Sequence, residues 1–232
     1  MDWRENACTL SELADKFYSM PGKLLYSDVT FVLSYGSEME AHKLILALAS
    51  PVFEMEFYGG QWAAKGRDRL DIVDDRGVFR ELVSFVYKQD VDFSCVDDLQ
   101  LWDLLYLANK YLISQLQTVL NKRLKECLKT CQHKPSLLKH WQRANENILG
   151  EKYLRLIKAE IETFAELIMS SDEFLKLGKE EAKEILEFEN LRVTECQVFK
   201  YAASGCLKNN HSDAQAEIVF LNGFQDIIDY DF

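Results

Sequence analysis

The sequence predicts an α+β fold for the first half of the chain, a small sheet flanked by helical hairpins, followed by an all-α second half. Three observations lead to this prediction. Residues 41–62 have the apolar spacing of two short helices in series. Residues 27–33, just upstream, alternate like a strand, and a turn at Gly36 leads into a short return strand through Met39. After residue 125 the apolar positions repeat at helical spacing, with no clear strand.

Composition and charge limit the classes of function. The 232 residues are 48% hydrophobic and 28% charged, as in ordinary folded proteins. The formal charge of −11 argues against nucleic acid as a partner, because phosphates attract basic surfaces. No apolar run approaches the roughly 20 residues of a membrane span, and the first ten residues lack a signal-peptide core. Six scattered cysteines do not form a secreted disulfide framework, so we expect a cytoplasmic or nuclear protein with no membrane partner.

The two helices of residues 41–62 are separated by a capping signal. Ser50 can cap the second helix, and Pro51 suits its first position because the missing N–H is not needed there. Gly59 and Gly60 then predict the end of that helix. The apolar positions are Leu44, Ile45, Leu48 and Ala49 in the first helix and Val52, Phe53, Met55 and Phe57 in the second.

A further helix is predicted ahead of this region. Thr9 and Glu12 fit a capping box, and Pro21 marks the end of the helix. Its apolar stripe has i, i+3, i+4, i+7 spacing and consists of Leu10, Leu13, Ala14 and Phe17. Two interpretations stay open: the helix packs on its own domain, or it packs on a second copy of the chain.

The string SDVTFVL…AHKLILALASPVFEMEFYGG combines turn, cap and apolar positions in a way that resembles the start of a BTB (POZ) domain. We place this domain at residues 10–125. In that family the helix ahead of the SDV strand packs across a two-fold axis on a second copy. The resemblance therefore implies a homodimer whose interface contains Leu10, Leu13, Ala14 and Phe17.

The rest of the first half follows the same family pattern. Residues 69–73 alternate like a half-buried strand, and Gly77 precedes a helix with an inward-facing stripe. Residues 87–93 resemble the short strand that follows in the family. Asp97 and Gln100 offer a second capping box, ahead of two more helices. The expected inward positions are Phe79, Leu82, Val83, Val86, Leu101, Leu104, Leu105, Ala108, Leu116, Val119, Leu120 and Leu124.

The second half contains the string FLKLGKEEAKEILEFENLRVTECQVF, which resembles a BACK domain, the helical module that commonly follows BTB. Within it Thr194 and Gln197 form a capping box. We place this domain at residues 126–232 and leave open whether its C-terminal end is complete. A tryptophan usual in one BACK helix falls here at Gly205.

The order BTB then BACK resembles the BTBD family of BTB–BACK proteins, or the front half of a kelch-type protein. Such proteins act as homodimeric substrate adaptors for cullin-3 ubiquitin ligases, in the ubiquitin-like conjugation pathway. The resemblance implies a cullin contact at Glu56, Tyr58 and Trp62 and a substrate protein whose identity the sequence does not give. Family members that bind the cullin well carry a hydrophobic residue, any residue, then glutamate, and here Ala64 takes the place of the acid. Trp62 is expected to anchor the contact; the alternative is that it folds back over Phe57. The alternative function is a dimerising scaffold or transcriptional co-regulator with no cullin partner.

Two residue sets could suggest chemistry. Asp28, His42 and Lys43 could be acid–base groups, but no nucleophile in a strained turn and no phosphate-binding loop accompanies them. We interpret them as a structural charged pocket. The set C-x3-C-x-H at Cys127, Cys131 and His133 supplies too few ligands for zinc. The sequence therefore predicts no enzyme, cofactor or metal.

Overall fold

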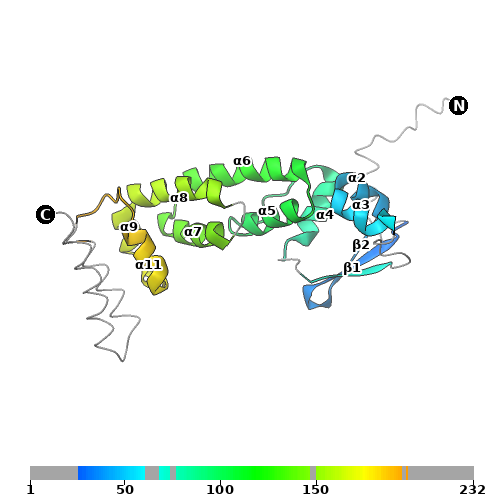
Figure 1. The fold of residues 1–232 in the computed structure, drawn as a ribbon, viewed down its shortest axis with the longest axis horizontal. Helices are drawn as coiled ribbons and strands as arrows, with labels where there is room; N and C mark the ends of the chain where they lie inside the picture. Colours follow the sequence, from blue (N-terminus) through cyan, green and yellow to red (C-terminus); the bar gives the residue numbers. More distant parts are fainter. Residues whose placement is uncertain (1–25, 61–67, 74–76, 147–149, 195–196, 198–232) are drawn as a thin grey trace. The chain divides into compact units, whose positions relative to one another are not determined.

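The computed structural model describes residues 26–60, 68–73, 77–146, 150–194 and 197. The chain divides into two compact units, residues 1–125 and residues 126–232. The first unit contains the strands and the second is helical in its described part (Figure 1). Within the described ranges, no helix is both long and apolar enough to span a membrane.

The first unit is built on a three-stranded sheet in the order β2-β1-β3. Strand β1 (Val29–Leu33) pairs antiparallel with β2 (Glu38–Ala41) and parallel with β3 (Arg69–Ile72). The short 3-10 turn η2 (Ser34–Gly36) joins β1 to β2. Alternate residues of β1 are buried, as the period of two predicts, so one face of the strand lies in the core.

A helical hairpin follows the sheet. It consists of α2 (Lys43–Ala49) and α3 (Pro51–Tyr58), which pack on each other (Figure 1). The predicted cap is confirmed: the Ser50 hydroxyl accepts the Phe53 N–H at 3.3 Å, and Pro51 occupies the first position of α3. The helix ends at Gly59, whose N–H donates to Met55 O. Leu46 is the buried leucine of α2, whereas Leu44 and Leu48 lie on its exposed face.

Aromatic rings hold α3 against the rest of the unit. Phe53 stacks on Tyr111 with ring centroids 4.5 Å apart and on Phe57 at 5.8 Å. Phe31 of β1 meets the Phe79 ring edge-to-face at 5.1 Å. Aromatic contacts of this geometry stabilise a core beyond simple area burial, so the position of α3 is well defined.

Helix α4 (Phe79–Lys88) buries the stripe that its sequence predicts. The strand predicted at residues 87–93 is wrong, because Tyr87 and Lys88 belong to this helix. Gln89 then adopts a left-handed conformation with φ of 56° and ends it. The backbone that follows turns rather than extends, because the carboxylates of Asp90 and Asp92 accept the N–H groups of Val91 and Ser94.

Two helices complete the first unit. The box ahead of α5 (Gln100–Lys110) is confirmed: Asp97 Oδ1 accepts the Gln100 N–H at 2.7 Å, and Gln100 Oε1 accepts the Asp97 N–H at 3.0 Å. Helix α6 (Ser114–Thr130) runs across the boundary of the two units. Its inward leucines are buried as predicted, but Val119 is exposed.

The second unit consists of short helices in its described part. They are η4 (Lys134–Ser136), α7 (Leu137–Glu146), α8 (Glu151–Thr163), α9 (Ala165–Met169), α10 (Asp172–Leu175) and α11 (Lys179–Leu186). Helices α7 and α8 pack on each other through buried apolar residues. Lys134 connects η4 to α8 through an ion pair with Glu160 at 2.9 Å. The predicted capping box of Thr194 and Gln197 is present, since Thr194 Oγ1 accepts the Gln197 N–H at 3.4 Å.

Candidate functional site

The predicted charged set lies where the sheet meets the helical hairpin. Asp28, ahead of β1, accepts the backbone N–H of Lys43 at 2.7 Å. The Lys43 ammonium pairs instead with Asp68, at 2.8 Å, so one carboxylate holds the backbone of Lys43 and the other its side chain. The Asp68 side chain is 80% exposed, and such an exposed pair contributes little to stability.

His42 occupies a separate, buried environment. The Tyr87 hydroxyl accepts the backbone N–H of His42 at 2.9 Å and hydrogen-bonds Nδ1 of its ring at 2.8 Å. Both bonds join the start of α2 to α4. Asp28 thus contacts the backbone of Lys43, while the His42 ring contacts Tyr87. These contacts are suited to holding the start of α2 against β1 and α4.

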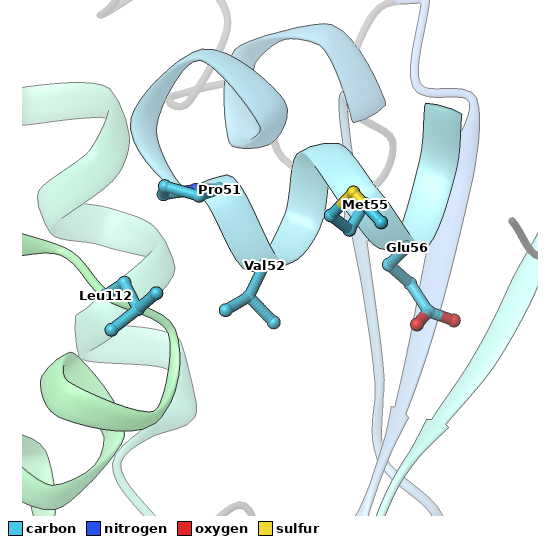
Figure 2. Close-up of a pocket in the computed structure, with 5 residues that line it drawn as sticks. All are labelled: Pro51, Val52, Met55, Glu56 and Leu112. Atoms are coloured by element: carbon cyan, nitrogen blue, oxygen red, sulfur yellow. The ribbon is translucent and has the colours of Figure 1, made fainter. Parts of the chain in front are cut away.

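An apolar hollow opens on the surface of α3. It is lined by Pro51, Val52, Met55, Glu56 and Leu112, and its volume is about 380 Å³ (Figure 2). Val52 and Leu112 lie across from each other, with Met55 and Glu56 further along α3 (Figure 2). Met55 is 56% exposed and Leu112 is 53% exposed. Clustered exposed apolar side chains of this kind make the hollow a candidate protein-interaction site.

The residues predicted to contact a cullin fall beside this hollow or outside the described part. Glu56 lines it, and Tyr58 is exposed at the last position of α3. Trp62 lies outside the described residues. Sequence reasoning missed Leu112, which stands in a corner between two helices. The signal that could have revealed it is the lack of a glycine between these helices, where a left-handed residue is usual.

The remaining predicted sets lie elsewhere. Leu10, Leu13, Ala14 and Phe17 are outside the described residues. Cys127 is buried in α6, and Cys131 follows that helix, with Sγ 3.1 Å from Ser136 Oγ. The His133 ring is 3.3 Å from a Glu173 carboxylate oxygen. The pKa of Glu173 is lowered, first by a hydrogen bond from its own backbone and then by this contact with His133. Within the described ranges, no three such side chains gather as they would around a metal ion.

A small sheet beside a helical hairpin with an exposed apolar hollow is typical of a protein–protein interaction module. Comparison with known proteins gives the family. Residues 17–128 match the family model described as the BTB/POZ domain. The chain is 28% identical over 182 residues to BTB/POZ domain-containing protein 3 of Homo sapiens, covering 77% of this chain and 33% of that protein. It is 29% identical over 178 residues to BTB/POZ domain-containing protein 6-A of Danio rerio, covering 75% and 31%.

Residues 17–128 therefore form a BTB/POZ domain, which confirms that resemblance and the α+β fold class. It spans about a third of the length of the curated relatives it matches. Among solved structures, the BTB domain of zebrafish PATZ1 aligns with a TM-score of 0.41 and 21% identity, over 50% of this chain and 88% of that chain.

Proposed function

We propose that this protein is a homodimeric, non-enzymatic adaptor or scaffold that binds cullin-3 through the α3 surface of its BTB/POZ domain. A substrate protein would be held by another part of the assembly, and residues 126–232 would form a BACK domain that extends the cullin contact. The proposed compartment is the cytoplasm. The BTB/POZ domain supports an interaction role, and the finer assignment rests on the resemblance to cullin adaptors.

The observation that carries the proposal is the apolar hollow on α3. Four of its five lining residues are apolar, while Glu56 places a carboxylate at one end. A partner that fits would present an apolar side chain next to a basic one. The chain has a formal charge of −11, which would further favour a basic contact surface on the partner.

Titration with the N-terminal region of cullin-3 tests the proposal. We expect Trp62→Ala to weaken binding about tenfold or more, because a large aromatic residue in a contact often dominates its energy. The melting temperature should stay nearly unchanged, and Trp62→Phe should retain most of the affinity. Ala64→Glu should tighten binding, by analogy with the family motif.

The alternative function is a scaffold or transcriptional co-regulator without a cullin, and it predicts that the protein does not bind cullin-3. No affinity of the wild type for cullin-3, together with none created by Ala64→Glu, would favour that alternative. Unfolding of the Trp62→Ala variant would show that this side chain belongs to the core and does not anchor the partner.

A further inference from the structure

We draw no further inference here: the strongest candidate, the cavity of about 210 Å³ lined by α4 and by residues 90–95 with the exposed Cys95 among them, carries nothing, because basic and acidic side chains line it together and nothing in the structure shows what would occupy it.

Discussion

Tyr153 is a fully buried ionisable side chain near the start of α8. Burial raises the pKa of its phenol to about 12 from an ordinary value of 10.0, because the charged phenolate loses water. The folded chain therefore keeps this proton at a pH where the unfolded chain has lost it. Its contribution to stability is complete below pH 10 and is lost as the pH rises toward 12.

We expect the free energy of unfolding of the wild type to fall between pH 10 and pH 12, and Tyr153→Phe to show a flatter profile over that interval. Urea denaturation at several pH values measures the slope, which is informative even if the variant is less stable overall. Tyr58→Phe, which changes an exposed tyrosine, serves as control and should keep the wild-type slope. Equal slopes for wild type and Tyr153→Phe would contradict the expectation.

Gly150 lies at the start of α8, where a side chain has no room. A Cβ atom at this position would stand 1.7 Å from Ala144 O, a backbone atom of α7. We expect Gly150→Ala to destabilise the second unit by about 1–3 kcal/mol through overpacking. Thermal melts should show no comparable loss for Gly178→Ala, where the nearest atom is a flexible glutamate oxygen at 3.4 Å. A Gly150→Ala variant as stable as the wild type would contradict the close approach.

At the scale of residues, the sequence predicted the local signals best. The caps at Ser50, Asp97 and Thr194 are present because each needs only a side chain and a backbone N–H a few positions away. The left-handed conformation of Leu112 was missed, because glycine is the usual signal for it and this chain has none between the two helices. The partners of His42 and Lys43 likewise come from distant parts of the chain.

At the scale of elements, one hydroxyl joins the α2–α3 hairpin to the α5–α6 corner. Ser50 accepts the Phe53 N–H as a cap and donates to Tyr111 O, and it is completely buried. Loss of this hydroxyl would remove one buried hydrogen bond from each of two backbone groups, Phe53 N–H and Tyr111 O. A buried group in that state costs more than an ordinary exposed cap.

We therefore expect Ser50→Ala to lower the free energy of unfolding by about 2 kcal/mol or more. Asp97→Ala, which removes the exposed cap of α5, should cost about 1 kcal/mol. Chemical denaturation of both variants checks the order. If Asp97→Ala were the more damaging change, the connection through Tyr111 would not matter to stability.

The predicted strand at residues 87–93 shows where element prediction fails. Apolar residues at positions 85–87 suit a strand or a helix, and the helix prevails because Tyr87 can then reach the backbone N–H of His42. The helical hairpin of residues 41–60 was predicted only in part. Its helices are where the spacing predicts, but Leu44, Leu48 and Met55 are exposed, so apolar spacing alone did not identify the core face.

At the scale of the whole molecule, the exposed leucines of α2 support the proposed dimer. Leu44 is 61% exposed and Leu48 is 81% exposed on one short helix. A second copy that contributes the predicted helix around Leu13 and Phe17 would find an apolar surface there. Burial of such side chains contributes roughly 1.5–3 kcal/mol each, before the costs of association.

We expect the wild type to be a dimer at micromolar concentration, and the double variant Leu13→Asp with Phe17→Asp to be a monomer of lower stability. Light scattering measures the mass of both proteins. The variant Val119→Asp, which places a charge on the exposed face of α6, serves as a control and should remain a dimer. A monomeric wild type would refute the dimer and leave the exposed leucines of α2 unexplained.

The parallel pairing of β1 with β3 has a consequence for the order of folding. β1 finds β2 through a tight turn, but it meets β3 only after the chain has passed through the whole α2–α3 hairpin. Local contacts form fastest, and pairing between distant segments must first overcome the entropy of closing the loop. The β1–β2 hairpin and the α2–α3 pair can thus assemble early from neighbouring residues, and β3 joins an edge that they have already built. We therefore expect the three-stranded sheet to be completed only after these two local pairs have formed.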